Sequence, residues 1–211
     1  MQQLRGTVRS YAWGSRTAIA ELTGRPVPTD RPEAELWLGA HPASPSSVCV
    51  SGISTSLMDV IERDPQAQLG PGCRATFGDR LPFLLKVLAA EEPLSLQAHP
   101  SAEQAQQGYA AEQRRRIPLD SPKRSYRDRH HKPELVCALT SFDALVGFRA
   151  IDRTIALLQA LDCPALLPDV ELLTAQPNAE GLRALFTRWI TLPTAPLRAL
   201  LPTVAARCAA L

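Results

Sequence analysis

Polar side chains recur at every second position of the segment 91–100. If this segment is a β-strand, Ser95, Gln97 and His99 lie on one face and apolar side chains on the other, because successive side chains of a strand point to opposite faces. Gln97 and His99 would then direct an amide oxygen and an imidazole nitrogen towards one point, as two metal ligands do. Pro100 ends the predicted strand, since proline has no N–H to donate.

A second segment offers a carboxylate for the same point. Glu134 follows His130 and His131 and precedes the apolar run 135–139, which we expect to be another strand. Imidazole nitrogen, carboxylate oxygen and amide oxygen suit zinc or a similar divalent ion with open coordination positions, which is typical of a catalytic site. The alternative is that Gln97 and His99 are hydrogen-bonded residues of the core or its rim.

The run 81–89 is almost continuously apolar and is interrupted by a single charge, Lys86. Such a run predicts a buried strand. A buried ammonium group needs a partner, because an unpaired charge in the interior is strongly destabilising or loses its proton. We therefore expect Lys86 to face an anionic ligand or a carboxylate in the same cavity.

The segment 114–132 carries eight basic side chains and only two acidic ones. The plainest interpretation is a solvated loop, and the functional alternative is a loop that handles an anion over the site. Nucleic-acid binding is the weakest of the three interpretations. Tyr126 is the only Phe, Tyr or Trp of this segment that could stack on a base, and the net charge of the chain is only +2.

Composition sets wider limits on the function. With 211 residues, of which 45% are hydrophobic, the chain can bury one substantial core, or one core and a smaller appendage. The five cysteines form no C-x-x-C pair, so we expect neither a disulfide framework nor a zinc knuckle. The sequence contains no apolar run that could span a bilayer, and its start lacks the apolar core of a signal peptide. We expect a cytoplasmic protein without a membrane partner.

Short strands and helices are expected up to about residue 150. They include a helix over 101–115 that begins with a capping box, and a hairpin over 134–149. Helical periodicity dominates after residue 150, where Asp152 and Asn178 are the expected N-caps. The apolar stripes of these helices indicate a packed core without reactive groups. The change near residue 150 is the expected domain boundary.

Four motifs occur in the order YAWGS, AELWLGAHP, LPFLLKVLAAEEPLSLQAHP and YRDRHHKPELVCALT. In this combination the chain resembles the type I mannose-6-phosphate isomerases, over essentially its whole length and most strongly over 81–140. The resemblance implies a mainly β fold, an incomplete cupin-type jelly roll (double-stranded β-helix), with an α-helical insertion. It implies a cupin-type metal-binding domain over 1–149 and an apparently truncated helical domain over 150–211.

The resemblance also implies roles for individual residues. Gln97, His99 and Glu134 would be three of the four ligands of one zinc ion per chain. Ser95 and Lys86 would bind the phosphate of the sugar-phosphate substrate. The implied reaction interconverts mannose 6-phosphate and fructose 6-phosphate through an enediol.

Lys132 lies in the substrate cavity by the same resemblance, and its proximity to Glu134 makes it a candidate for the proton-transfer base. The chain departs from the family's pattern at Arg129 and His130, where proline and asparagine are usual. More important, the family's fourth ligand, a histidine, and its catalytic arginine follow the helical insertion, whereas no histidine follows His131 here. The alternative prediction is therefore an inactive fragment, or a sugar-phosphate-binding cupin without turnover.

Overall fold

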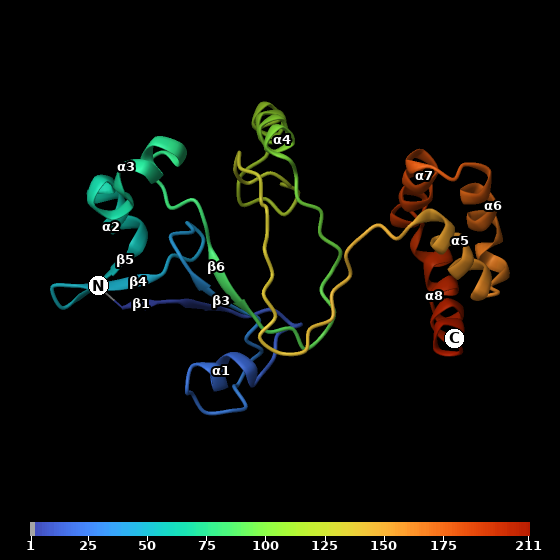
Figure 1. The fold of residues 1–211 in the computed structure, drawn as a ribbon, viewed down its shortest axis with the longest axis horizontal. Coiled ribbons are helices and arrows are strands. Elements are labelled where there is room, and N and C mark those ends of the chain that lie inside the picture. Colours follow the sequence, from blue (N-terminus) through green and yellow to red (C-terminus); the bar gives the residue numbers. More distant parts are fainter. Residues whose placement is uncertain (1–2) are drawn as a thin grey trace. The chain divides into compact units, whose positions relative to one another are not determined.

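The computed structural model describes residues 3–211, and the chain forms two compact units, Met1–Pro133 and Glu134–Leu211. The strands lie in the first unit, together with helices, and the second unit is an extended segment followed by helices (Figure 1). The division between the units precedes the expected boundary at residues 149–150.

The strands of the first unit form two small antiparallel sheets, in the orders β1-β4-β5 and β2-β3-β6. The turn between β4 and β5 consists of Ser51 and Gly52, both with positive φ, which is the geometry that a tight hairpin favours. The strands are β1 (Leu4–Arg5), β2 (Thr7–Arg9), β3 (Glu35–Leu38), β4 (Ser47–Val50), β5 (Ile53–Ser56) and β6 (Leu85–Leu88).

The second sheet determines which side chains share a face. Trp37 on the central strand β3 lies opposite Lys86 of β6 and Thr7 of β2, and Glu35 lies opposite Arg9. Directly paired residues lie on the same face of a sheet, as do residues two apart in one strand. One face of this sheet therefore carries a carboxylate, an indole and two cations.

The helices of the first unit are α1 (Ala18–Leu22), α2 (Leu57–Arg63), α3 (Pro65–Phe77) and α4 (Ala102–Arg114). At the start of α4, the Ser101 hydroxyl accepts a hydrogen bond from the backbone N–H of Gln104, and the Gln104 side chain accepts one from the backbone N–H of Ser101. These bonds confirm the predicted capping box, which satisfies amides that have no partner within the helix.

Part of the basic segment 114–132 packs against α4. The Glu112 carboxylate accepts hydrogen bonds from the backbone N–H groups of Ser125 (3.0 Å) and Tyr126 (2.9 Å). The Arg124 side chain is fully buried, and its guanidinium donates to the backbone oxygen of Tyr126. For this part of the segment the interpretation as a solvated loop is wrong, because buried charged side chains hold its backbone.

The second unit is built of α5 (Ile151–Ala160), a 3-10 helix η1 (Pro164–Leu166), α6 (Leu167–Ala175), α7 (Ala179–Ile190) and α8 (Thr194–Ala209). The Asn178 side chain accepts hydrogen bonds from two backbone N–H groups of α7, so this predicted N-cap is confirmed. The predicted N-cap Asp152 is wrong. Ala150 occupies that position, and Asp152 lies in the first turn of α5, where a negative charge still stabilises the helix. The buried core consists of Leu158, Leu161, Cys163, Leu166, Leu173 and Leu185.

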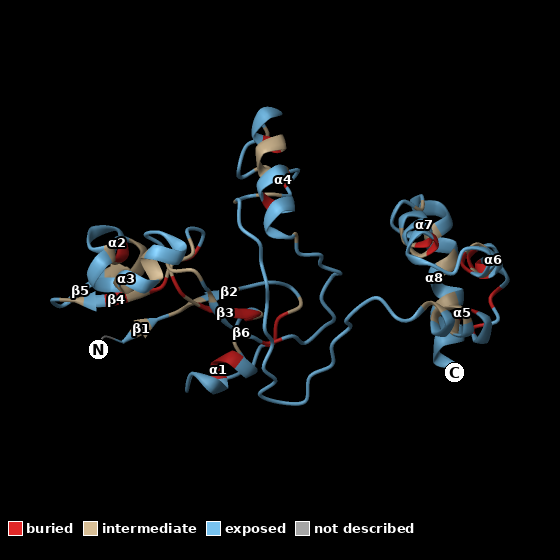
Figure 2. Cartoon of the chain, turned by 45° about the horizontal axis from the view of Figure 1, so that its top comes forward, coloured by how far each residue is buried: buried red, intermediate tan, exposed pale blue. Residues whose placement is uncertain are grey.

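Two predicted β-regions do not form strands. None of the residues 93–100 belongs to a strand, and residues 134–149 form no hairpin. Both segments are largely exposed (Figure 2). A strand requires a neighbouring strand whose backbone groups complete its ladder of hydrogen bonds, and an alternating side-chain pattern does not reveal whether that neighbour exists.

The predicted buried strand 81–89 is also only partly correct. The strand β6 spans Leu85–Leu88 alone, and three of its four residues are exposed. The order of strands first and helices last is confirmed, but the fold is mixed, with two small antiparallel sheets, and its β-part is smaller than predicted.

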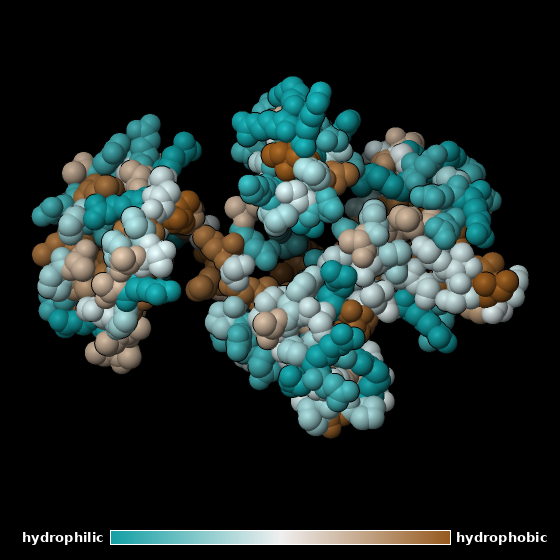
Figure 3. Space-filling model, turned by 180° about the vertical axis from the view of Figure 1, so that it is seen from behind, coloured by the Kyte–Doolittle hydropathy of each residue, from teal (hydrophilic) through white to brown (hydrophobic). Residues whose placement is uncertain are grey.

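Large apolar side chains lie on the surface of both units (Figure 3). Phe83, Leu85 and Leu96 are examples in the first unit, and Leu135 and Leu145 in the second. All five side chains lie in segments that were expected to form strands. In these segments both the predicted burial and most of the predicted strand structure are therefore missing.

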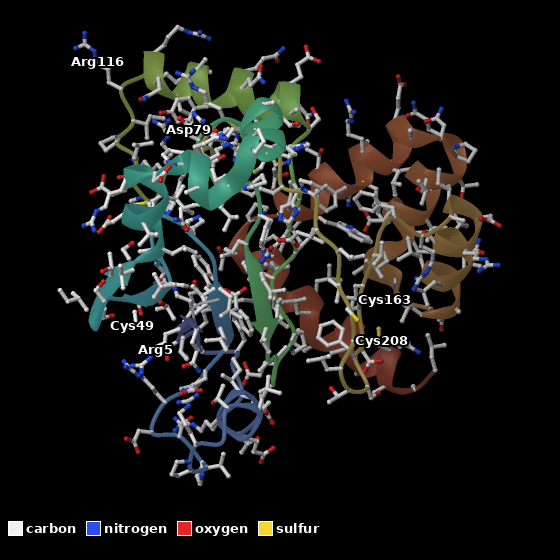
Figure 4. All side chains as sticks on the ribbon, turned by 60° about the vertical axis from the view of Figure 1, so that its left-hand side comes forward. Arg5, Cys49, Asp79, Arg116, Cys163 and Cys208 are labelled. Atoms are coloured by element: carbon white, nitrogen blue, oxygen red, sulfur yellow. The ribbon has the colours of Figure 1, made fainter. Side chains whose placement is uncertain are left out.

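The five cysteines are free thiols, so the expectation that they form no disulfide framework is confirmed. Cys49 lies on β4, and Cys163 and Cys208 belong to the helical unit (Figure 4). Cys163 is buried in the helical core. Among residues 3–211, the structure has no helix that is both long enough and apolar enough to cross a membrane.

Candidate functional site

Lys86 lies on β6 beside two side chains of β3. Its Nζ atom is 3.5 Å from Oε1 of Glu35 and 5.0 Å from the centroid of the Trp37 ring. The Lys86 side chain is 34% exposed. The prediction of a buried strand around Lys86 is wrong, because three of the four residues of β6 are exposed, but the expected carboxylate partner is present.

Glu35 supplies that carboxylate and is itself buried. Its second oxygen, Oε2, accepts a hydrogen bond from the indole Nε1–H of Trp37 at 2.9 Å. Both oxygens are therefore occupied, one by an ammonium group and one by an indole. Glu35 and Trp37 were not expected in the site, although two residues that are two positions apart on a strand lie on one face.

A second cation lies at the same indole ring. The Arg9 guanidinium carbon is 5.2 Å from the centroid of Trp37 and 5.9 Å from that of Tyr11, distances at which a cation is attracted to the face of an aromatic ring. The Nη1 atom of Arg9 also donates to the hydroxyl of Ser44 at 3.3 Å. Arg9 is a further residue that the sequence analysis did not single out.

His41 follows β3 and completes a group of side chains around Trp37. Its ring meets the Trp37 ring edge-on, with centroids 4.9 Å apart, and its Nδ1 accepts a hydrogen bond from the backbone N–H of Ala43. These contacts give His41 a structural role in the turn that follows β3. We call Arg9, Glu35, Trp37, His41 and Lys86 the Trp37 cluster.

The charge around His41 is mostly positive. Burial lowers the pKa of His41 below its ordinary value of 6.5, and the positive charge of Lys132 lowers it further, while Asp128 opposes the shift. Lys86 and Arg9 add smaller shifts in the same downward direction. At neutral pH the imidazole is therefore uncharged, and the cations of this neighbourhood are the lysines and the arginine.

Lys132 thus acts in the same neighbourhood as Lys86. Its Nζ lies 3.9 Å from Oδ2 of Asp128, and its side chain is 55% exposed. The positive charges of Lys132 and Lys86, two residues singled out from the sequence, both lower the pKa of His41. This connection lies wholly within the first unit.

The predicted metal ligands lie in segments without strands. Ser95, Gln97 and His99 are exposed in the first unit, and Glu134 is the first residue of the second unit. Gln97 and His99 do not lie on a strand, so the alternation of side chains along a strand does not direct them to one point. Their convergence with Glu134 stays a prediction.

The chemistry of these donors fits zinc. An amide oxygen, an imidazole nitrogen and a carboxylate oxygen are all ligands that this ion accepts. Within the described chain, no group of three or more His, Cys, Asp or Glu side chains is arranged to hold a metal ion. The predicted ligands are His99, Glu134 and the amide of Gln97, and glutamine is not one of those four residue types. The predicted set is therefore not a group of that kind.

The sequence matches a family model. The model of the phosphomannose isomerase type I catalytic domain matches residues 1–151. The mannose-6-phosphate isomerase of Escherichia coli (strain K12) is 46% identical over 187 residues, which are 88% of this chain and 47% of that protein. The mannose-6-phosphate isomerase of Homo sapiens is 37% identical over 160 residues, which are 72% of this chain and 36% of that protein. The chain spans about half the length of the bacterial relatives that it matches.

Solved structures give the same result. The mannose 6-phosphate isomerase from Salmonella typhimurium, bound to fructose 6-phosphate and zinc, superposes with a TM-score of 0.89 at 41% identity, covering 100% of this chain and 53% of that one. A K86A mutant of the phosphomannose isomerase from the same organism superposes with a TM-score of 0.90 at 40% identity, with the same coverage. Structures of H99A and E134A mutants of that protein are similar to this chain as well.

Proposed function

The chain belongs to the type I phosphomannose isomerase family, and from this premise we propose that it serves the zinc-dependent interconversion of mannose 6-phosphate and fructose 6-phosphate. The relatives carry the name of this activity, and one similar structure contains both zinc and fructose 6-phosphate. The single observation on this chain that carries the proposal is the position of Lys86, a partly exposed cation held beside Glu35 and Trp37.

We assign zinc to Gln97, His99 and Glu134. With one carboxylate and two neutral ligands, the set leaves a positive charge on the ion. When bound, zinc would act as a Lewis acid that stabilises negative charge on the oxygens of the reacting sugar. Mutants of the Salmonella typhimurium protein named H99A and E134A carry changes at the same residue types and numbers as His99 and Glu134, which supports the assignment.

Lys86, with Ser95, would bind the phosphate of the substrate. The Lys86 side chain is 34% exposed, so an anion can approach it while a carboxylate and a ring hold its ammonium group. Phosphate lies at the end of the sugar remote from the reacting carbons. Its binding energy would orient C1 and C2 of the sugar.

Lys132 is our candidate for the group that moves the proton. The isomerisation removes the proton from C2 of the aldose, passes through an enediol, and returns a proton to C1. A positioned lysine amine can take up a proton as a general base and return it as the conjugate acid. The Lys132 side chain is 55% exposed, with Nζ 3.9 Å from Oδ2 of Asp128, and its positive charge lowers the pKa of His41 in the Trp37 cluster.

We further propose that the two sheets of the first unit belong to a cupin-type jelly roll, with a metal-binding domain over 1–149 and a helical domain over 150–211. The two antiparallel sheets and the match of the catalytic-domain model to residues 1–151 support this division. The extended segments 93–100 and 134–148 would be strands of that roll whenever a neighbouring backbone pairs with them.

A second candidate function is sugar-phosphate binding without turnover. The favouring observation is that Lys86, the proposed phosphate-binding residue, lies on a strand paired with β3, whereas the proposed metal ligands lie in segments without strands. Binding through Lys86 does not require a complete set of metal ligands. The two functions therefore predict different outcomes in one experiment.

The experiment measures isomerase turnover and fructose 6-phosphate binding by this chain loaded with zinc, beside the His99→Ala variant. The proposed isomerase gives turnover that His99→Ala abolishes. Binding with no turnover in either protein favours the second candidate. Equal turnover by the wild type and the metal-free variant would contradict the proposed zinc-dependent reaction.

A further inference from the structure

We propose that Glu35 is a positioning residue that holds the ammonium group of Lys86 where an anionic group of the substrate meets it. The inference deepens the proposed function, because it rests on the role of Lys86 in binding phosphate. Glu35 itself would touch no substrate. It would act through Lys86 alone.

The contacts of the Glu35 carboxylate are the first argument. Oε2 accepts the indole N–H of Trp37 at 2.9 Å, and this short bond fixes the carboxylate on a ring that is itself buried. Oε1 faces Nζ of Lys86 at 3.5 Å. The strand register adds to this arrangement, because Trp37 and Lys86 are directly paired across β3 and β6. Lysine is flexible, so a fixed acceptor restricts where its ammonium group lies.

The difference in burial is the second argument. The Glu35 side chain is 11% exposed and that of Lys86 is 34% exposed. The carboxylate therefore lies inside and the ammonium group lies further out. An approaching phosphate would meet the cation, while the carboxylate, which would repel it, lies behind.

The charge balance of the Trp37 cluster is the third argument. Lys86 and Arg9 both lie within 5.2 Å of the centroid of Trp37, and Glu35 is the carboxylate of this cluster. His41 adds no positive charge at neutral pH because its pKa is lowered. Two cations against one carboxylate leave a net positive charge on this face of the sheet. Glu35 thus orders Lys86 without cancelling the attraction for an anion.

The test uses the chemical reactivity of the three lysines of the chain, Lys86, Lys123 and Lys132. The intact chain is treated with acetic anhydride, and labelling of each lysine is followed by mass spectrometry, with Lys123 as the internal standard. In Glu35→Gln we expect Lys86 to be labelled roughly threefold faster relative to Lys123, because its ammonium group loses a charged acceptor. An unchanged ratio of Lys86 to Lys123 would overturn the proposal.

Glu33→Gln is the matched control. Glu33 is a second buried carboxylate near the same strand, but its partner is Arg25 and not a lysine. We expect Glu33→Gln to leave the labelling of Lys86 unchanged. If it accelerates Lys86 as much as Glu35→Gln does, the effect is general loosening of the unit, and Glu35 has no specific positioning role.

A second variant covers the case that Glu35→Gln does not fold. Trp37→Phe keeps an aromatic ring beside Lys86 but removes the N–H that fixes Oε2 of Glu35. We expect a smaller acceleration of Lys86 labelling than in Glu35→Gln, since the ion pair remains and only its anchor is lost. No acceleration in Trp37→Phe would contradict the anchoring of Glu35 by the indole.

Inorganic phosphate separates this inference from the proposed function. We expect phosphate to slow the labelling of Lys86 in the wild type, and to do so less in Glu35→Gln. If phosphate protects Lys86 equally in both proteins, the positioning role is wrong. If phosphate does not protect Lys86 in the wild type, the phosphate-binding role of Lys86 fails, and the labelling ratio without phosphate still decides whether Glu35 positions it.

Discussion

The two regions that carry the proposed chemistry differ in how they are held. Four of the five side chains of the Trp37 cluster project from the paired strands β2, β3 and β6, whose register fixes their neighbours, and His41 follows β3. The proposed metal ligands lie in the segments 93–100 and 134–148, which are exposed and have no strand partners among the described residues. The paired strands of one sheet thus hold the cationic part of the site. Strand pairing does not hold the segments that carry the proposed metal ligands.

Substitutions in the core of the sheet give the largest contrast. Trp37 is 8% exposed and Leu96 is 74% exposed. We expect Trp37→Ala to destabilise the first unit by roughly 3–5 kcal/mol, because a large buried side chain and its hydrogen bond are lost. We expect Leu96→Ala to change stability by less than about 0.5 kcal/mol. Urea unfolding followed by circular dichroism measures both, and an equal loss in the two variants would remove the distinction between the regions.

The part of the basic segment 114–132 that packs against α4 gives a second contrast, with the exposed segments that carry the proposed metal ligands. In Glu112→Gln the amides of Ser125 and Tyr126 lose a charged acceptor. We expect these amides to exchange with deuterium about tenfold faster, because bonds to a charged group are stronger than neutral ones. Glu103→Gln, an exposed change on the same helix, is the control and should alter neither amide. Unchanged exchange in Glu112→Gln would mean that other contacts hold this loop.

Acid should release the same loop. Hydrogen bonds from the backbone N–H of Ser125, and then of Tyr126, lower the pKa of Glu112 below its ordinary value of 4.5, against the opposing effect of burial. A carboxylate with a lowered pKa stabilises the folded state above its unfolded pKa, and this stabilisation is lost as the pH falls through the folded pKa. We expect stability to fall more steeply below pH 4.5 in the wild type than in Glu112→Gln. Parallel acid-unfolding curves would contradict this.

The smallest predicted effect concerns His41. Proton NMR titration should give a midpoint below 6.5, because burial and then the charge of Lys132 disfavour the imidazolium. Lys132→Met removes one of these cations and should move the midpoint upward. Lys123→Met, which removes a lysine that does not act on His41, is the control. An unmoved midpoint in Lys132→Met would show that Lys132 is too far from the Trp37 cluster to share its site.

Local signals in the sequence predicted local structure well. The capping box at Ser101 and Gln104 and the N-cap at Asn178 depend only on side chains a few residues apart, and both are confirmed. The sequence also led us to expect that Lys86 faces a carboxylate or an anionic ligand, and the partner is a carboxylate. Its identity was not expected, because Glu35 and Lys86 are 51 positions apart and only the pairing of β3 with β6 brings them together.

Non-local structure is where the sequence predictions were wrong. Alternating side chains in 91–100 and apolar runs after Glu134 predicted strands, but strand formation depends on a backbone neighbour that no side-chain pattern encodes. The basic segment was misjudged for a related reason. The burial of Arg124 depends on Glu112 of α4, which lies outside the run of charges.

Metal binding by the extended segments tests the central claim most directly. Cobalt(II) is titrated into the wild type, His99→Ala and Glu134→Ala, and its visible absorption reports the ligand types. We predict one cobalt ion per wild-type chain, with a spectrum of nitrogen and oxygen ligands, and weakened binding in both variants. Equal binding by all three proteins, or a thiolate charge-transfer band from the five free cysteines, would contradict a metal site formed by Gln97, His99 and Glu134.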